Sequence, residues 1–341
     1  MDVFVSTLLT VVFLSILYTK TLEKQRRYVY ISIVTILVLV AGLRYNVGYD
    51  YPAYVYNYFI YLNKEFDILR QPALTLIAII SDYIYSDYAT WFFIMSLITV
   101  IPVTIMIYKE SRYPCLCIIM YILLGCWHYP FNIVKQGVAA SIIFCGLKAI
   151  MNRNIKEWIT YCLVAAMFHV SAVLMIPIYF LVADRIKIKN IIIIIFGGLS
   201  CWLFYDSLFY LIFIIKQGEH LGSMSNQTVT ESVNFLRILV NCAPIALFAS
   251  IHKKCRNQNN IYLFYLSLIN MMLNIASMNS IYLNRICCYT NMFNILFIPD
   301  LLMRIKNKFI VFVILLLYSI FWGYDIYKTQ SLVEFSWIFE R

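Results

Sequence analysis

The charged residues that follow the second apolar run are the first candidates for chemistry. Arg44 and Asp50 stand six residues apart after the apolar run 29–43, in a stretch that also contains Gly48, Pro52 and several tyrosines. Gly48 and Pro52 predict a turn instead of a continued helix. An aspartate can act as a general base toward a sugar hydroxyl, and an arginine can bind phosphate through two parallel hydrogen bonds. The structural alternative is that Asp50 pairs with Arg44 or caps the next segment.

Two further basic residues resemble Arg44 in their placement. Arg44, Lys135 and Arg285 each border a different predicted helix on the same predicted side of a membrane. If these helix ends converge, the three side chains form a cationic pocket that suits a lipid diphosphate. The alternative is that each side chain extends separately toward lipid headgroups.

His169 is the second candidate for a catalytic base. It interrupts an otherwise apolar segment, and Ser171 follows two residues later. An ionisable side chain in such a segment is costly unless it is paired or hydrated, which makes it a functional candidate. The alternative is a histidine that only hydrogen-bonds to a neighbouring helix. Asp50 and His169 both remain open as the base.

The other residue types narrow the chemistry. No second carboxylate accompanies Asp50, which argues against a two-carboxylate glycosidase. No cluster of His, Asp or Cys has ligand spacing, so we predict no metal and no cofactor. The tyrosines of residues 45–61 suit the aromatic belt of a membrane interface, although such rings also stack on sugars. Tyr54 is the one we single out for a glycan.

Composition identifies the environment of these residues. The chain has 341 residues, of which 62% are hydrophobic and 13% charged. A soluble domain carries about a quarter charged residues, so this composition predicts an integral membrane protein. The net charge of +10 comes from short basic clusters between apolar runs, as in cytoplasmic loops, so nucleic acid is the weaker interpretation.

The apolar runs predict an all-α bundle that forms one transmembrane domain, residues 1–341. A span needs about 20 residues, and ten candidates are 3–19, 28–43, 89–108, 114–129, 136–151, 190–215, 235–251, 261–278, 287–303 and 309–324. Two segments are irregular. Residues 72–86 predict a half-helix or interfacial helix, and residues 158–183 predict two short helices that meet at Phe168-His169.

The basic residues predict the orientation. One set of loops contains 18 of the 27 Lys and Arg residues, which places that set in the cytoplasm. The loops 44–71 and 216–234 then face outward. Irregular backbone at membrane depth survives only where it lines a cavity. The two irregular segments therefore predict a cavity that opens outward.

Four short motifs, in this order, resemble the EpsG/Wzy-type polysaccharide polymerases. They are Arg-Tyr-Asn-Val-Gly-x-Asp-Tyr-x-x-Tyr at 44–54, Asn-Ile-Val-Lys-Gln at 132–136, Phe-His-Val-Ser at 168–171 and Asn-Arg-x-x-x-Tyr at 284–289. A proline-initiated short helix at Gln71-Pro72 lies between the first two. The family often has Glu-Pro and Arg-Gln where this chain has Gln71-Pro72 and Lys135-Gln136. These departures remove one acid and replace a bidentate cation with a point charge.

The resemblance implies a GT-C-like membrane glycosyltransferase. Such enzymes polymerise undecaprenyl-diphosphate-linked repeat units at the outer face of the bacterial cytoplasmic membrane, for O-antigen, capsule or exopolysaccharide. Expected partners are the lipid-linked donor and acceptor, membrane lipid, a chain-length regulator and a flippase. A flippase or transporter, or a membrane O-acetyltransferase or ligase, is the alternative function.

The resemblance also implies roles for individual residues. Asp50 or His169 would act on the acceptor hydroxyl without a metal. The residues assigned to the diphosphate are Arg44, Lys135 and Arg285, and those assigned to the glycan are Tyr45, Tyr54, Gln136 and Tyr289.

Overall fold

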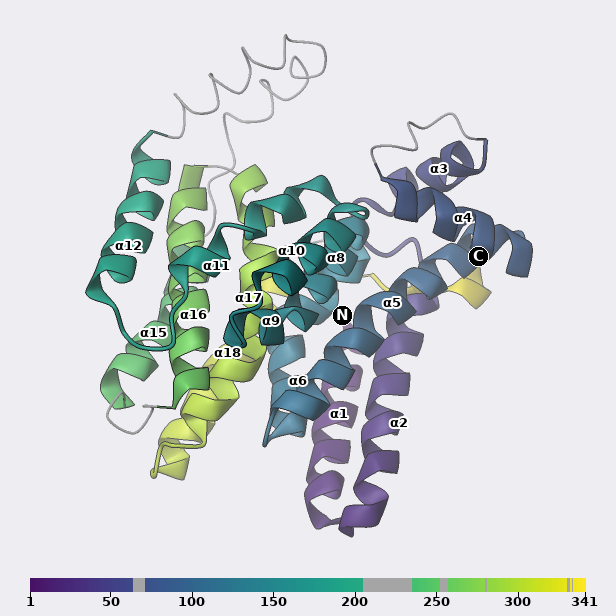
Figure 1. Cartoon of the computed structure of the whole chain (residues 1–341). Coiled ribbons are helices and arrows are strands. Elements are labelled where there is room, and N and C mark those ends of the chain that lie inside the picture. Colours follow the sequence, from purple (N-terminus) through teal and green to yellow (C-terminus); the bar gives the residue numbers. More distant parts are fainter. Residues whose placement is uncertain (64–70, 205–234, 252–256, 280, 330–331, 333) are drawn as a thin grey trace.

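Helices make up most of the part of the chain that the structure describes, and the strands there form one short pair. The computed structural model describes all residues except 64–70, 205–234, 252–256, 280, 330–331 and 333 (Figure 1). The predicted outward loop 216–234 and the end of the predicted span 190–215 lie outside the described residues.

Five helical stretches in the described chain are long and apolar enough to cross a membrane. They are α1 (Asp2–Lys20), α2 (Glu23–Gly42), α5 (Tyr88–Glu110), the continuous α8 (Val134–Cys145) and α9 (Leu147–Met151), and α18 (Lys308–Lys328). A sixth is α6 (Pro114–Leu123), if the bend of 62° toward η1 (Cys126–His128) and α7 (Tyr129–Asn132) is counted as one span. An all-α membrane protein is therefore confirmed, whereas ten spans and a GT-C-like arrangement remain predictions.

The remaining predicted spans form helices, but they are shorter or more polar. Helices α12 (Ile188–Leu203) and α15 (Phe235–Ile251) have 16 and 17 described residues. Helices α16 (Gln258–Ala276) and α17 (Ile281–Leu302) are longer but carry several asparagines, which lowers their hydropathy. Buried amides such as Asn270 and Asn274 face protein instead of lipid. A long helix with such residues can therefore lie in the bundle without a strongly apolar sequence.

Prolines and polar caps mark many helix starts. Pro52, Pro72 and Pro114 occupy the first turns of α3 (Tyr51–Leu62), α4 (Pro72–Ile84) and α6, where the missing N–H costs no hydrogen bond. Asp87 caps α5 by accepting a hydrogen bond from the backbone N–H of Ala89 at 2.9 Å.

Within the described part of the predicted loop 44–71, residues 51–62 form the helix α3. Its tyrosines Tyr51, Tyr54, Tyr58 and Tyr61 recur every three or four residues, so they share one face. All four are buried, and Tyr51 stacks on Phe92 of α5 with 4.4 Å between ring centroids. Figure 1 shows α3 and α4 beside α5 at one edge of the molecule. These rings therefore build a local core and are not a lipid-facing belt.

Both irregular segments contain the predicted breaks. Helix α4 has 13 residues, too few for a span of about 20. Helix α10 (Ile155–Ala166) ends before His169 and is followed by the 3₁₀ helix η2 (Val170–Met175) and by α11 (Ile178–Leu181). Arg153 fastens this segment by donating to the carbonyl oxygens of Tyr179 and Val182 at 3.0 and 2.8 Å.

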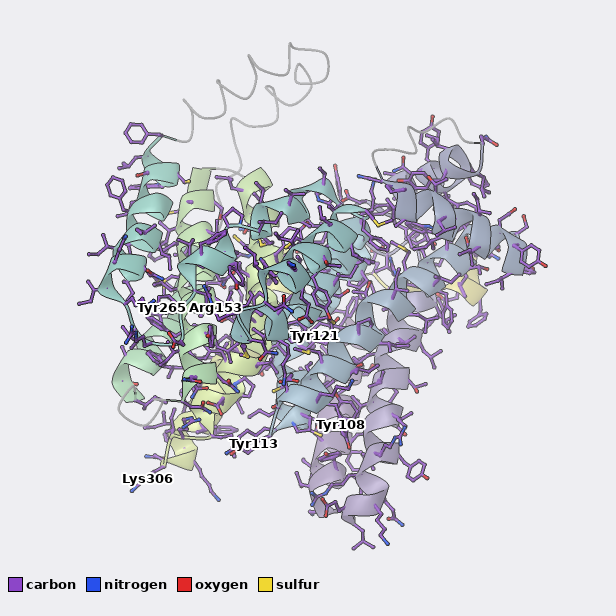
Figure 2. All side chains as sticks on the ribbon, in the orientation of Figure 1. Tyr108, Tyr113, Tyr121, Arg153, Tyr265 and Lys306 are labelled. Carbon is purple, nitrogen blue, oxygen red and sulfur yellow. The ribbon has the colours of Figure 1, made fainter. Side chains whose placement is uncertain are left out.

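Three loops that were predicted to be cytoplasmic lie at one end of the molecule. Tyr113 and Lys306 belong to two of them, and both lie toward the end that also contains the α1–α2 turn (Figures 1 and 2). Arg153, from a further loop of the same predicted set, lies nearer the middle of the molecule (Figure 2). The common position therefore holds for three loops only, and the side of the membrane remains a prediction.

The C-terminal residues return to the turn that follows α2. Strand β2 (Ser336–Trp337) pairs antiparallel with β1 (Arg44–Tyr45), and the N–H of Ile338 donates to the carbonyl of Leu43 at 2.8 Å. Beyond the 3₁₀ helix η6 (Ile338–Glu340), Arg341 forms an ion pair with Asp87 at the start of α5. The tail therefore braces the turn that leads to Asp50.

Candidate functional site

A glycine-dependent turn places Asp50. Gly48 has a φ of +105°, and a Cβ built there would lie 2.0 Å from the carbonyl oxygen of Phe131. Only glycine combines that backbone conformation with such a close approach. Asn132 completes the junction, because its Oδ1 accepts a hydrogen bond from the N–H of Tyr49 at 2.8 Å. Helix α7 thus fixes the residue that precedes Asp50.

The carboxylate of Asp50 faces a cation from another helix. Asp50 occupies the N-cap position of α3, yet its side chain makes no capping hydrogen bond. Its Oδ2 lies 4.0 Å from Nη2 of Arg285, at the start of α17, and the two side chains are 27% and 49% exposed. Neither structural alternative, a pair with Arg44 or a helix cap, is what the structure shows. The carboxylate is therefore accessible and loosely paired.

Arg44 lies elsewhere, enclosed by protein. Its residue is 1% exposed, and its guanidinium donates to the carbonyl oxygens of Ala41 and Pro130, the latter at 2.5 Å. The rings of Phe92 and Phe131 lie 4.8 and 5.0 Å from the guanidinium carbon. A buried cation with these partners joins the end of α2 to α7. The structure gives Arg44 a structural role instead of the diphosphate contact that the sequence predicted.

Tyr45 also departs from its predicted glycan role. It is half-buried in β1 opposite Ser336, and its ring makes an edge contact with Tyr51 at 6.3 Å between centroids. These contacts secure the strand pair.

Lys135 lies in the first turn of α8, close to α3 and α4. Its Nζ donates to the hydroxyl of Tyr61 at 3.3 Å and to Oε1 of Gln71 at 3.2 Å, and it lies 5.8 Å from the centroid of the Tyr54 ring. Lys135 is also within electrostatic reach of Asp50. The first turn of α8 has no side-chain cap, so its backbone N–H groups add positive potential beside the ammonium. The positive charge around Lys135 therefore favours an anion as ligand.

Gln136 connects the start of α8, beside Lys135, to α17. Its Nε2 donates to the backbone carbonyl of Arg285 at 2.9 Å, and its side chain also hydrogen-bonds to Tyr289. Arg285 and Tyr289 are four residues apart on α17 and therefore lie on one face. Gln136, predicted to contact glycan, thus positions the cation and the tyrosine.

His169 completes the cluster from the break after α10. Its Nδ1 lies 2.7 Å from Oγ of Ser171, which lies 2.8 Å from the hydroxyl of Tyr289. The tyrosine hydroxyl is also 3.4 Å from Nδ1. Lys135 and Arg285 are both within electrostatic reach of the imidazole. Ser171 and Tyr289 fix the ring through one nitrogen, which leaves Nε2 for a substrate.

The described chain therefore brings seven of the nine predicted site residues together. They are Asp50, Tyr54, Lys135, Gln136, His169, Arg285 and Tyr289, and we call this group the cationic cluster. Sequence reasoning did not assign Tyr61, Gln71 or Asn132 to the site. Gln71 and Asn132 belong to the motifs, and Tyr61 belongs to the run of tyrosines at 45–61, but only the folded chain shows which side chains they contact.

The cluster has cations and hydrogen-bonding groups but no metal-ligand set. Among the described residues, no group of three or more His, Cys, Asp and Glu side chains could bind a metal ion. The chemistry available here is anion binding by Lys135 and Arg285 and proton transfer by Asp50 or His169.

Comparison with known proteins identifies the family. The sequence model of the EpsG family matches residues 27–338, nearly the whole chain. No curated protein and no solved structure matches the chain. The matched range includes every residue of the cationic cluster. The chain therefore belongs to the EpsG family.

Proposed function

We propose that this protein is a membrane glycosyltransferase that polymerises oligosaccharide repeat units carried on a polyprenyl diphosphate, at the outer face of the bacterial cytoplasmic membrane. One observation carries the proposal. Four separate segments, namely the α3 start, the α8 start, the α10–η2 break and the α17 start, bring Asp50, Lys135, His169 and Arg285 into one partly exposed cluster. Family membership and the apolar helices support the same class of protein.

The cations are assigned to the leaving diphosphate. Negative charge develops on the diphosphate as the glycosidic bond to the lipid breaks, and preorganised cations stabilise that charge best where water is partly excluded. Lys135 and the uncapped first turn of α8 supply one anion contact, and the half-exposed Arg285 supplies the other. Two contacts from different helices suit the two phosphates.

Asp50 is assigned as the general base. Its carboxylate has one loose partner at 4.0 Å and is partly exposed, so it can accept a proton from an acceptor hydroxyl. His169 is assigned to orient that hydroxyl, because Ser171 and Tyr289 fix its ring. The acceptor oxygen then attacks the anomeric carbon as the diphosphate leaves with the bonding electrons.

Deletion of the gene in its host tests the proposal. Loss of a polymerase leaves single repeat units on the cell surface, loss of a flippase leaves none, and loss of an acetyltransferase leaves normal chain lengths. Complementation with Asp50→Asn is expected to leave single units. The matched control is Asp184→Asn, an exposed aspartate outside the cluster, which is expected to restore full-length glycan.

The outward location has its own test. A phosphatase fused after residue 60 is active only if α3 faces outward. An active fusion at 60 and an inactive one at 110 support the proposed side. The reverse pattern would place the cluster at the cytoplasmic face and exclude the proposed reaction there.

A further inference from the structure

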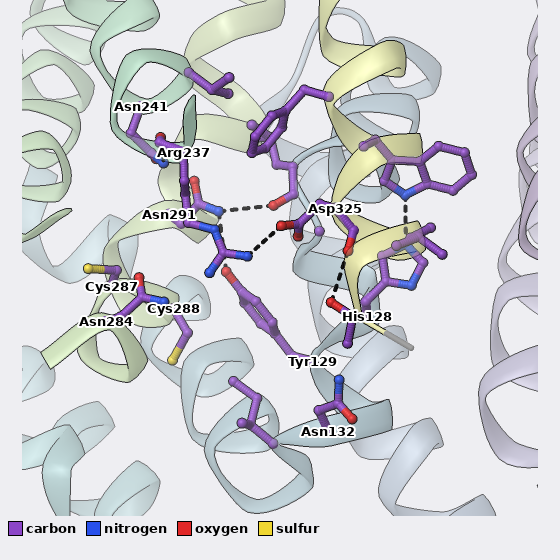
Figure 3. A pocket seen from close by; sticks show the side chains of 18 of the residues that line it. His128, Tyr129, Asn132, Arg237, Asn241, Asn284, Cys287, Cys288, Asn291 and Asp325 are labelled. Carbon is purple, nitrogen blue, oxygen red and sulfur yellow. Dashed lines mark hydrogen bonds and ion pairs between the residues drawn. The ribbon is translucent and has the colours of Figure 1, made fainter. Parts of the chain in front are cut away.

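A second polar feature lies beside the cationic cluster. It is a pocket of about 300 Å³ between α15, α17, α18 and the bend that joins α6 to α7 (Figure 3). This volume lies at the lower end of the roughly 300–1,000 Å³ of small-molecule sites. We call it the amide pocket, because its polar lining is dominated by Asn132, Asn241, Asn274, Asn284 and Asn291.

The amide pocket is close to electrically neutral apart from its edge at Arg285. Arg237 donates to Oδ1 of Asp325 at 2.5 Å, so the guanidinium and the carboxylate compensate each other (Figure 3). A neutral pocket does not favour a diphosphate. Each asparagine amide offers both a donor and an acceptor, which matches the donor and acceptor pattern of sugar hydroxyls.

Four of the five amides already hydrogen-bond within the protein. Asn132 accepts from the N–H of Tyr49, and Asn274 donates to the carbonyl of Asn270 at 2.8 Å. Asn291 donates to the hydroxyl of Tyr129 at 3.2 Å, and Asn241 donates to the carbonyl of Arg237 at 2.8 Å. The side chain of Asn284 makes no hydrogen bond with any other residue that the structure describes. Its amide is therefore available to a ligand, next to Arg285 in the chain.

The amide pocket adjoins the proposed reaction centre at two points. Arg285 lines it and also pairs with Asp50. Asn132 lines it as well and accepts a hydrogen bond from the N–H of Tyr49, the residue before Asp50. A group bound in the pocket would therefore extend directly to the cluster.

We propose that the amide pocket is a sugar-binding subsite. It takes one uncharged, hydroxyl-rich sugar residue of the lipid-linked glycan, next to the bond that the cluster makes. This inference rests on the proposed function for the identity of the glycan. The pocket itself recognises the sugar through the amides, with Asn284 as the residue that binds and Asn241 and Asn291 as part of the rigid wall.

Binding of a free oligosaccharide tests the subsite independently of catalysis. The probe is the repeat unit of the host's own surface glycan, released from its lipid by mild acid, and binding to the purified full-length protein is measured by calorimetry. Asn284→Leu should raise Kd about tenfold, since the loss of one or two hydrogen bonds at about 0.5–1.5 kcal/mol each corresponds to that factor. Asn284→Ala removes the same bonds without bulk, so it covers the case in which leucine does not fit. Asn259→Leu, an exposed asparagine on α16, is the control.

The outcomes separate the subsite from the reaction. The proposal is supported if Asn284→Ala weakens the oligosaccharide and leaves the affinity for inorganic pyrophosphate unchanged. It is overturned if the variant weakens pyrophosphate instead, or if the wild type and the variant bind the oligosaccharide equally. The proposed chemistry fails separately: if Asp50→Asn still polymerises, Asp50 is not the base. The subsite would still stand in that case, provided that Asn284→Ala weakens oligosaccharide binding as described.

Discussion

Replacing Lys135 with methionine removes the ammonium group and keeps most of the side-chain length. In the proposed reaction this deletes one of two cations at the leaving diphosphate. The charge is preorganised, because Tyr61 and Gln71 hold Nζ at 3.3 and 3.2 Å and the uncapped first turn of α8 adds its own positive potential. Loss of one preorganised group at a developing charge costs about 10²–10³ in kcat, or about 2.7–4 kcal/mol.

Purified protein acting on lipid-linked repeat units measures this effect. We expect Lys135→Met to lower kcat by about 10²–10³, and Lys135→Arg to retain most of the rate because it keeps the positive charge. The control is Lys148→Met, which removes an exposed lysine that pairs with Glu110 at 3.1 Å and lies outside the cluster. A kcat of Lys135→Met within threefold of the wild type would refute the assignment of the lysine to the diphosphate.

Three further predictions concern the frame around the cluster. Gly48→Ala should abolish chain growth and reduce the yield of folded protein, because its Cβ would meet the carbonyl of Phe131 at 2.0 Å; size-exclusion profiles and glycan ladders measure both. Arg44→Met should lower the melting temperature and leave the KM of the folded fraction near wild type, whereas a large rise in KM would return Arg44 to the substrate site. Arg341 lowers the pKa of Asp87 below its usual range through its hydrogen bonds. The pair stabilises the fold only while Asp87 is ionised, so the melting-temperature difference between Arg341→Ala and wild type should be full at pH 7. It should shrink as the pH falls below about 4; a difference that is constant with pH would contradict this linkage.

Much of the cationic cluster could be predicted from sequence because charges at the ends of apolar runs are conspicuous. Lys135, Arg285 and His169 interrupt or border such runs, and topology does not require them there. Their convergence follows once helix ends on one side are assumed to meet. The motifs that resemble the EpsG/Wzy-type polymerases contain the same three residues. The break at His169 was also predictable, because His169 interrupts an otherwise apolar segment.

Other features depended on contacts that sequence does not encode locally. Arg44 resembles Lys135 in its placement, and only the fold shows the rings of Phe92 and Phe131 that enclose it. The tyrosines of α3 were predicted to belong to the aromatic belt of a membrane interface, because tyrosine suits both such an interface and a protein core. The amide pocket draws on helices far apart in sequence, and the pairing of β2 with β1 joins residues nearly 300 positions apart.

Chain growth by the purified protein tests the central claim most directly. Wild-type protein in lipid nanodiscs receives polyprenyl-diphosphate-linked repeat units as its sole substrate, and the products are separated by length. The account predicts that wild-type protein forms chains of two or more units with release of polyprenyl diphosphate, and that Asp50→Asn forms none. Unchanged single units with the wild type, or equal chain growth with Asp50→Asn, would contradict it.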